Sequence, residues 1–216
     1  MKRPFIIAVA GPGSNSGKTH LVCALIRHLR RGQEIGAVKI ATSTPDHMCA
    51  RTNLPCDCLR FDGKMRLLKD PAYINKVGKD TAMMHAAGAQ PVWWLQTTSD
   101  VQTESSRFLH GELEGPSIWV IEGSGPIRAG IADLTIVVAR ADGKKPKDSW
   151  YELVPMANIL AVSHEQEIFT PDNREAIPGL KQEAQILDFS GTSLDLNASF
   201  QDALVPYFEN NRLSKK

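Results

Sequence analysis

Continuous apolar runs alternate along the chain with segments whose apolar residues recur every three or four positions. The first run, residues 4–10, is typical of a strand buried on both faces of a parallel sheet. A glycine-rich turn follows it, and then comes a helical pattern of apolar positions at Leu21, Val22, Leu25, Ile26 and Leu29. The chain therefore begins with a strand, a loop and a helix.

The same two patterns continue towards the end of the chain. They predict further strands over residues 34–40, 91–96, 117–121, 134–139, 159–162 and 184–189, and further helices over 79–87, 102–113 and 198–209. Strands that alternate with helices predict a three-layer α/β fold, a mostly parallel sheet with helices on both faces. A length of 216 residues suits a single domain of this kind, residues 1–216. Residues 41–75 are the exception, because their prolines and lack of periodicity indicate a long irregular insertion.

The charged residues are balanced, with 25 Lys and Arg against 24 Asp and Glu and a net charge of +1. Such a chain has no overall field that attracts nucleic acid or anionic lipid. Its first apolar run is long enough for a strand but not for a membrane-spanning helix, and no small-residue cleavage site follows it. We therefore expect a cytoplasmic protein that binds neither nucleic acid nor membranes.

The turn between the first strand and the first helix has the sequence GPGSNSGKT over residues 11–19. A glycine-rich turn that ends in Gly-Lys-Thr, in a strand-turn-helix unit, is typical of a phosphate-binding P-loop. Its backbone N–H groups can converge on phosphates, Lys18 adds a positive charge near the β and γ phosphates, and the Thr19 hydroxyl can bind Mg²⁺. The alternative, a glycine-rich turn without a ligand, does not require Lys followed by Thr. The residues predicted to contact the nucleotide are consecutive: Gly13, Ser14, Asn15, Ser16, Gly17, Lys18, Thr19 and His20.

The loop is one residue longer than the general pattern GxxxxGKT, because Pro12 stands where that pattern has glycine. The longer form, GxxxxxGKT counted from Gly11, resembles dethiobiotin synthetase and the cobyrinic and cobyric acid synthetases. These enzymes belong to a larger class of P-loop proteins that includes metallocofactor chaperones. The resemblance implies that the three predicted layers are those of a P-loop NTPase.

A carboxylate follows the apolar run 117–121, at the strand end where ligands bind a parallel sheet. This residue, Glu122, could hold Mg²⁺ through water or orient the attacking water, and Gly123 and Gly125 could let the backbone approach the γ phosphate. The alternative is a solvated carboxylate in a turn. The segment EGSGP resembles the VEGAG segment of dethiobiotin synthetase-like proteins, and this resemblance implies the catalytic role.

Two further segments resemble the molybdopterin-guanine dinucleotide biosynthesis adaptor family, known as MobB. GAVK at residues 36–39 is similar to that family's GTVKH segment, and GKDT at 78–81 with AGA at 87–89 is similar to its GKDS and AGA elements. The resemblance implies slow Mg²⁺-dependent hydrolysis of a nucleoside triphosphate, GTP in preference to ATP. It also implies a homodimer and a partner enzyme of molybdenum-cofactor biosynthesis. The family's histidine-rich stretch is replaced here by IATST at residues 40–44.

The resemblance also draws attention to acidic residues beyond Glu122. Asp80 and its neighbour Lys79 could contact phosphate, metal or a dimer partner, although Asp80 could instead cap the helix that begins there. Asp46 is a second Mg²⁺ candidate, by resemblance to the aspartate that related synthetases carry after this strand. Three other residues compete with it: Asp57, Asp62 and Asp70.

Three of the four cysteines lie close together in the predicted insertion. With a neighbouring histidine they form the set His47, Cys49, Cys56 and Cys58, which has enough ligands for a tetrahedral Zn²⁺ site. An iron–sulfur, nickel or copper site, reduced thiols and a redox pair are the alternatives. The fourth, Cys23, lies among apolar residues of the first helix and is expected to be a core residue.

The base of the nucleotide is not specified by a sequence motif. After the apolar run 159–162 the chain reads SHEQE in place of the guanine-reading NKxD, although Glu165 or Glu167 could accept hydrogen bonds from guanine. GTP and ATP therefore both stay open. Besides the MobB-like NTPase, three functions remain: an ATP-dependent ligase resembling dethiobiotin synthetase, a metallochaperone NTPase that uses the cysteine loop, and a non-catalytic nucleotide-binding module.

Overall fold

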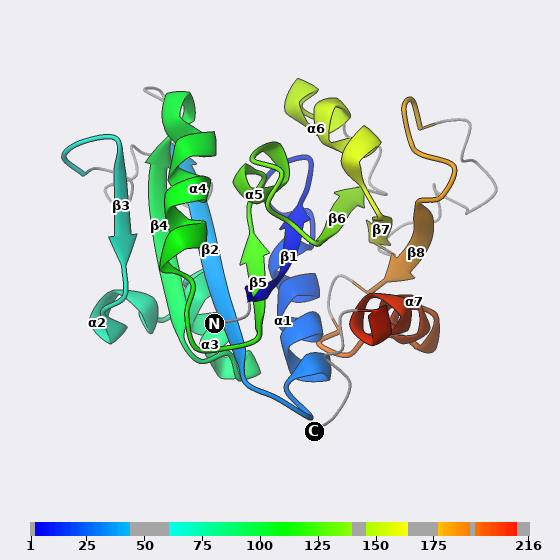
Figure 1. The fold of residues 1–216 in the computed structure, drawn as a ribbon, viewed down its shortest axis with the longest axis horizontal. Coiled ribbons are helices and arrows are strands. Elements are labelled where there is room, and N and C mark those ends of the chain that lie inside the picture. The colour runs from blue at the N-terminus through cyan, green and yellow to red at the C-terminus, as the bar shows by residue number, and fades with distance from the viewer. Residues whose placement is uncertain (1–2, 44–60, 140–145, 164–176, 191–192, 211–216) are drawn as a thin grey trace.

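The computed structural model describes residues 3–43, 61–139, 146–163, 177–190 and 193–210. The strands are β1 Phe5–Ala10, β2 Ile35–Ser43, β3 Met65–Leu68, β4 Val92–Thr98, β5 Ile118–Glu122, β6 Leu134–Ala139, β7 Ile159–Ser163 and β8 Gln185–Phe189. Within the described ranges these eight strands form one sheet in the order β3-β4-β2-β5-β1-β6-β7-β8 (Figure 1). Neighbouring strands run parallel, except that β3 pairs antiparallel with β4 at the edge.

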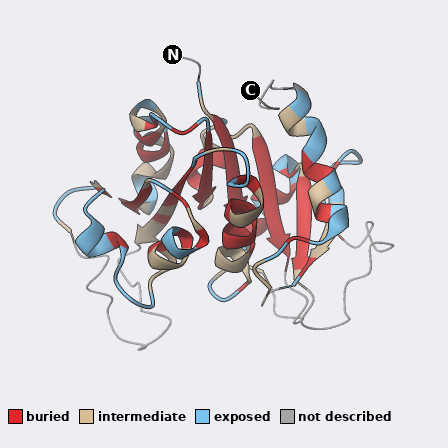
Figure 2. Cartoon of the chain, turned by 90° about the horizontal axis from the view of Figure 1, so that it is seen from below, coloured by how far each residue is buried: buried red, intermediate tan, exposed pale blue. Residues whose placement is uncertain are grey.

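Helices cover both faces of this sheet. They are α1 Lys18–Leu29, α2 Pro71–Ile74, α3 Asp80–Ala87, α4 Gln102–Glu112, α5 Gly125–Arg128, α6 Asp148–Leu153 and α7 Ala198–Asn210, with single 3-10 turns at η2 Ser99–Val101 and η3 Val154–Met156. Buried side chains of α1, α2, α3 and α7 pack with one face of the sheet, and those of α4, α5 and α6 pack with the other. The strands are accordingly buried between helices whose outer surfaces are exposed (Figure 2). The predicted three-layer α/β fold is confirmed.

Strand β1 shows why a continuous apolar run was the correct signal for this sheet. Its side chains alternate between the layers, so that Ile7 and Val9 contact the core beneath α1, while Ile6 and Ala8 contact the opposite core. All six of its residues are buried. A strand covered by helices on both faces has no solvent-facing positions, and it therefore carries no polar alternation.

The segment predicted as an irregular insertion, residues 41–75, contains regular structure in its described parts. β2 continues to Ser43, which pairs with Thr98 of β4, and β3 then adds a short edge strand. Asp70 caps α2, because its side chain accepts a 2.8 Å hydrogen bond from the backbone N–H of Ala72. The expectation of irregularity is wrong here, since a four-residue, largely exposed edge strand has too little apolar pattern to be detected.

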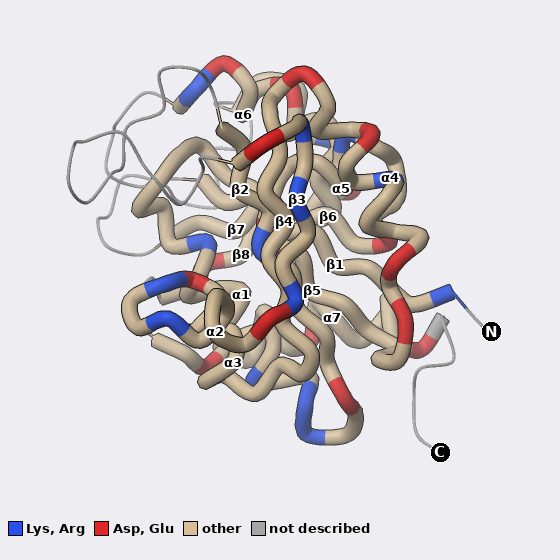
Figure 3. Tube along the Cα trace, turned by 90° about the vertical axis from the view of Figure 1, so that its left-hand side faces the viewer, with Lys and Arg blue, Asp and Glu red and all other residues tan. Residues whose placement is uncertain are grey.

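The surface around this sheet edge carries charges of both signs (Figure 3). Two of the ion pairs tie β3 and its flanks to neighbouring elements: Lys64 with Asp100 at 2.7 Å and Lys69 with Glu112 at 3.1 Å. Charged side chains along an exposed edge strand disfavour pairing with another chain.

Among the described residues, no helix has both the length and the apolar character needed to cross a membrane.

Gly36, part of the MobB-like segment GAVK, lies beside the fully buried indole of Trp119. The two residues are register partners on β2 and β5, and a Cβ at Gly36 would come within 2.5 Å of the indole ring. Atoms do not approach so closely, so any side chain at this position would displace a rigid, buried ring. The glycine therefore has a packing reason that is independent of any ligand.

Gly36→Ala is expected to destabilise the protein by about 1–3 kcal/mol, because a close-packed core accommodates an added methyl only by distortion. Gly32→Ala is the matched control, since Gly32 is exposed and a Cβ there would meet nothing within 4 Å. Urea unfolding followed by circular dichroism measures both variants. Equal stabilities for the two would contradict the packing of Trp119 across Gly36.

Candidate functional site

The predicted P-loop joins the carboxyl end of β1 to the amino end of α1. Two of its residues have positive φ, Asn15 at 57° and Gly17 at 81°. Gly17 is the N-cap of α1, and a Cβ there would lie 3.0 Å from the ring of Phe189 in β8. Glycine is thus required at position 17 both by the backbone and by packing. The loop lies at the N-terminus of α1, and helix N-termini are favourable positions for anions.

The side chain of Lys18 lies back over its own loop. Its ammonium donates hydrogen bonds to the Gly13 carbonyl and, over 3.0 Å, to Ser16 Oγ, which itself donates to the Gly13 carbonyl over 3.1 Å. These acceptors hold the ammonium beside the loop. The other predicted nucleotide contacts are at least partly accessible to solvent: Ser14 and Asn15, which are exposed, and His20, which is half-buried.

Thr19 and Glu122, the two predicted Mg²⁺ residues from these elements, are in contact. Thr19 Oγ1 donates a 3.0 Å hydrogen bond to Glu122 Oε2. The contact arises because β5 lies next to β1, which brings the carboxyl end of β5 beside the P-loop. Glu122 is only 1% exposed, so it is a buried carboxylate and not a solvated turn residue.

Lys39, to which no sequence motif assigns a role, also belongs to this site. Its Nζ lies 2.5 Å from Glu122 Oε1 and 2.8 Å from Asp80 Oδ2, so one ammonium bridges two carboxylates. Lys39 and Glu122 are register partners on β2 and β5. The signal was present in the sequence, since a lysine within the otherwise apolar run of β2 requires a buried partner.

The two carboxylates control the electrostatics of this cluster. Burial acts to lower the pKa of Lys39, but the charges of Glu122 and Asp80 outweigh it and hold that pKa well above its ordinary value. One helical turn below Thr19, burial raises the pKa of Cys23 to about 12, and the same two carboxylates add to the effect. Lys39 is therefore a cation, and Cys23 is an uncharged thiol in the core, as predicted.

Asp80 lies at the first residue of α3, and Lys79 is the N-cap. The Asp80 carboxylate pairs with Lys39, while Lys79 Nζ lies 5.7 Å from the ring centroid of Trp94. The alternative in which Asp80 is the cap of this helix is thus off by one position. The structure brings Asp80 together with Glu122 through Lys39, and it places Lys79 outside that cluster.

The glycines after Glu122 are closely packed, and the predicted approach of their backbone to the γ phosphate stays a prediction. A Cβ on Gly123 would lie 2.7 Å from Cβ of Ile40, and a Cβ on Gly125 would lie 2.1 Å from Ser106 Oγ. Gly123 also has a φ of 150°. The space beside these glycines is therefore filled by neighbouring side chains, and the small residues serve packing around the carboxyl end of β5.

Several predicted residues lie outside the described part of the chain. They are Asp46, the alternative Asp57, the set His47, Cys49, Cys56 and Cys58, and the base-reading candidates Glu165 and Glu167. Within the described ranges, no group of three or more His, Cys, Asp or Glu side chains is arranged to hold a metal ion. Of the aspartates that compete with Asp46 as Mg²⁺ candidates, Asp70 is the N-cap of α2.

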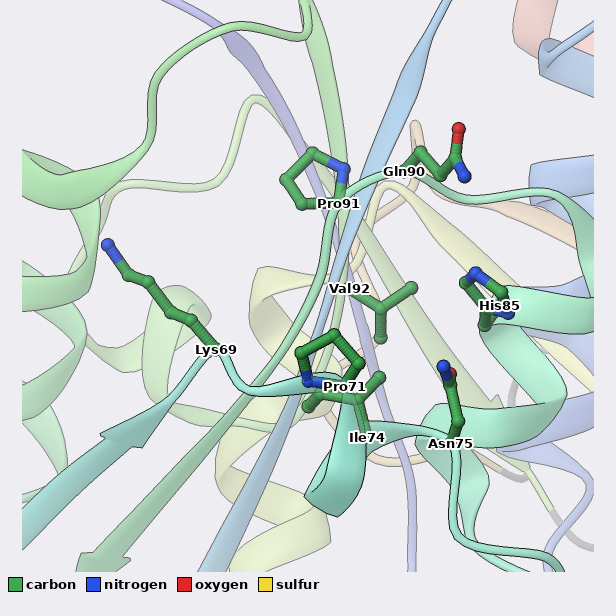
Figure 4. Close-up of a pocket in the computed structure, with 8 residues that line it drawn as sticks. All are labelled: Lys69, Pro71, Ile74, Asn75, His85, Gln90, Pro91 and Val92. Carbon is green, nitrogen blue, oxygen red and sulfur yellow. The ribbon is translucent and has the colours of Figure 1, made fainter.

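A separate cavity of about 160 Å³ lies between α2, α3 and the start of β4 (Figure 4). Ile74, His85, Gln90 and Val92 are among its lining residues. Val92 begins β4, whereas the phosphate loop and Glu122 lie at the carboxyl ends of their strands. This cavity therefore lies at the amino ends of the strands, away from their carboxyl ends, and is not part of the candidate site.

The sequence matches no known protein family and no curated protein. Among solved structures, the chain is similar to HypB from Helicobacter pylori in complex with nickel, with a TM-score of 0.56 and 12% identity over 97% of this chain and 89% of that chain. This chain has the P-loop NTPase fold. At such low identity the likeness extends to the fold alone, and it confirms the predicted fold class.

Two weaker likenesses were also found. A plasmid partition protein from Borrelia burgdorferi bound to AMPPNP matches with a TM-score of 0.46 and 11% identity over 97% of this chain and all of that chain. LpxK from Aquifex aeolicus in complex with ATP matches with a TM-score of 0.45 and 15% identity over 78% of this chain and 52% of that chain.

Proposed function

We propose that this protein binds a Mg²⁺–nucleoside triphosphate complex and hydrolyses it slowly. The observation that carries the proposal is the hydrogen bond between Thr19 and Glu122, because it joins the P-loop hydroxyl to a buried carboxylate at the strand ends. Both residues offer oxygen atoms, the ligand type that Mg²⁺ prefers, so the residues present fit the ion. When bound, Mg²⁺ would neutralise developing charge on the phosphates.

The residues of the chain have distinct roles in this proposal. The P-loop N–H groups and Lys18 bind phosphate oxygens, and Lys18 leaves its contacts with Gly13 and Ser16 to do so. Glu122 orients water at the carboxyl end of β5. Asp80 lies on the other side of Lys39, with its side chain 36% exposed, and completes the acidic edge of the site.

The biological context that we propose is molybdenum-cofactor (molybdopterin guanine dinucleotide) biosynthesis or delivery, with GTP as the preferred nucleotide. The support is that both MobB-like segments meet at the site, since GAVK contributes Lys39 and GKDT contributes Asp80. A homodimer and a cofactor-biosynthesis enzyme as partner belong to the same proposal. Light scattering of the nucleotide-loaded protein tests the dimer, and a monomer would remove that part.

Side-by-side calorimetric titrations with GTP and ATP, each with and without Mg²⁺, test the nucleotide proposal. The expected result is Mg²⁺-dependent binding that is tighter for GTP than for ATP, followed by slow release of phosphate. Failure to bind either nucleotide would overturn the proposal. Tighter binding of ATP would instead favour an ATP-dependent ligase that resembles dethiobiotin synthetase.

A metallochaperone NTPase is the second candidate function. It is favoured by the sequence set His47, Cys49, Cys56 and Cys58, and by the fold likeness to HypB, which was solved in complex with nickel. Four ligands of this mixture suit a closed tetrahedral site for Zn²⁺ or another transition metal. In this function, nucleotide hydrolysis would control the release of the metal.

Protein purified without chelator is expected to hold about one zinc ion per chain, because two or more thiolates with an imidazole bind Zn²⁺ tightly at neutral pH. The Cys56→Ser, Cys58→Ser double variant should lose this metal. Elemental analysis with thiol titration measures both proteins. Sub-stoichiometric metal in both, with thiols that react freely in the unaltered protein, would leave the cluster as reduced cysteines and disfavour the metallochaperone.

A further inference from the structure

Lys39 pairs with the carboxylate that the proposed metal site would use. Glu122 has two oxygens: Oε2 accepts from Thr19 over 3.0 Å, and Oε1 accepts from Lys39 Nζ over 2.5 Å. A Mg²⁺ ion held between Thr19 and Glu122, directly or through water, would use the same carboxylate. Two cations at one buried carboxylate repel each other, so the ammonium of Lys39 disfavours binding of the divalent cation.

The fold explains why an ammonium is found there. Register partners on neighbouring parallel strands point to the same face of a sheet, so Lys39 and Glu122 both face the layer of α1 and α3. The amino ends of these two helices supply Thr19 and Asp80. The side chain of Glu122 is 2% exposed, and a carboxylate so deeply buried is strongly destabilising unless a cation or donor accompanies it.

The ammonium of Lys39 also contacts a second carboxylate, that of Asp80. Its ammonium lies 2.8 Å from Asp80 Oδ2, and the Asp80 side chain is 36% exposed whereas that of Lys39 is 20% exposed. Contact with the more exposed carboxylate requires less desolvation than contact with Glu122. A small rotation of the lysine side chain can thus release Glu122 while the ion pair with Asp80 is kept.

We propose that Lys39 is a built-in counter-ion that holds Glu122 in the nucleotide-free protein and yields it to Mg²⁺ when the metal–nucleotide complex binds. The inference rests on the proposed function, because it requires Mg²⁺ at Thr19 and Glu122. It makes Lys39 a positioning residue with a defined exchange. The ammonium moves from a pair shared between Glu122 and Asp80 to a pair with Asp80 alone, and the amino end of α3 thereby responds to metal loading.

Two other roles for Lys39 make opposite predictions. A lysine that stays on Glu122 and orients it for the metal would strengthen metal binding. A lysine that contacts the triphosphate would strengthen nucleotide binding. Only a lysine that competes with the metal weakens metal binding. Removal of Lys39 is therefore expected to strengthen metal binding in this case alone.

The test uses Mn²⁺ as a spectroscopic substitute for Mg²⁺, with AMPPNP and GMPPNP as non-hydrolysable nucleotides. Lys39→Met keeps the length of the side chain and removes the charge. Lys64→Met is the matched control, because Lys64 forms an exposed ion pair with Asp100 outside the site. Electron paramagnetic resonance measures free and bound Mn²⁺, and a thermal melt of each variant is recorded with and without Mg²⁺–nucleotide.

Lys39→Met is expected to bind Mn²⁺ with nucleotide roughly tenfold more tightly than the unaltered protein, because a competing cation has been removed. Without metal it should melt at a lower temperature, since Glu122 then lacks its cation. Saturating Mg²⁺–nucleotide should reduce the difference in melting temperature between Lys39→Met and the unaltered protein. Lys64→Met should match the unaltered protein in both measurements. Unchanged or weaker Mn²⁺ binding by a folded Lys39→Met variant overturns the exchange.

Asp80→Asn carries the test if Lys39→Met does not fold. Removing the charge of Asp80, the second partner of Lys39, should keep the ammonium on Glu122. Mn²⁺ binding should then weaken several-fold, roughly in line with the loss of one exposed charge partner. Unchanged Mn²⁺ binding by this variant also overturns the exchange. The proposed function fails separately, when the unaltered protein binds neither Mn²⁺–AMPPNP nor Mn²⁺–GMPPNP.

Discussion

The Lys18→Ala variant is expected to lose triphosphate affinity by roughly 10- to 100-fold, because a charge-assisted hydrogen bond to a phosphate contributes about 1.5–3 kcal/mol. Its fold should be retained. The Lys18 ammonium donates to Gly13 and Ser16 of its own loop, so it links no distant elements through these bonds. Loss of these bonds should therefore leave the core of the fold unchanged.

Calorimetric titration of the variant with GTP and ATP measures this loss, and circular dichroism reports the fold. Lys64→Ala is the matched control, because Lys64 is an exposed lysine paired with Asp100. It should bind nucleotide as the unaltered protein does. A folded Lys18→Ala variant with unaltered affinity for both nucleotides would exclude the loop as the phosphate site.

Glu122→Gln is expected to retain nucleotide binding but to lose turnover by roughly 100-fold or more, since the carboxylate that places the metal and the water becomes a neutral amide. One amide oxygen can still accept from Thr19, and Lys39 keeps its ion pair with Asp80. The P-loop and its phosphate contacts should therefore stay intact. Phosphate release over time under saturating nucleotide measures the effect.

The matched control for this substitution is Glu112→Gln on the surface, where Glu112 pairs with Lys69 at 3.1 Å. It should hydrolyse nucleotide at the unaltered rate. Hydrolysis at that same rate by Glu122→Gln would remove Glu122 from the mechanism. Loss of nucleotide binding together with turnover would show that Glu122 supports the loop itself.

The local structural features at the start of the chain could be predicted from its sequence. The run before the P-loop predicted β1, the spacing of apolar residues predicted α1, and Gly-Lys-Thr between them predicted the phosphate loop. These features are local, because a strand, a turn and a helix each depend on residues a few positions apart. The alternation of strands and helices was enough for the fold class, which the sheet order and the likeness to HypB confirm.

Short and exposed elements were not legible in this way. β3 and α2 have four residues each, and their apolar positions are too few to show a period. They form because β4 offers a free edge to β3 and because Asp70 caps α2. Both causes involve partners outside the pattern of the segment itself.

The sequence by itself determined the glycine-rich loop between β1 and α1, the buried strands and the acidic residue at the end of β5, because each depends on neighbouring residues. Only the tertiary structure decided which of these features meet. It placed β5 between β1 and β2, and so brought Thr19, Lys39 and Glu122 together with Asp80. It also showed that Gly36 accommodates Trp119. Strand order and side-chain packing depend on contacts between residues far apart in the chain, which local periodicity does not encode.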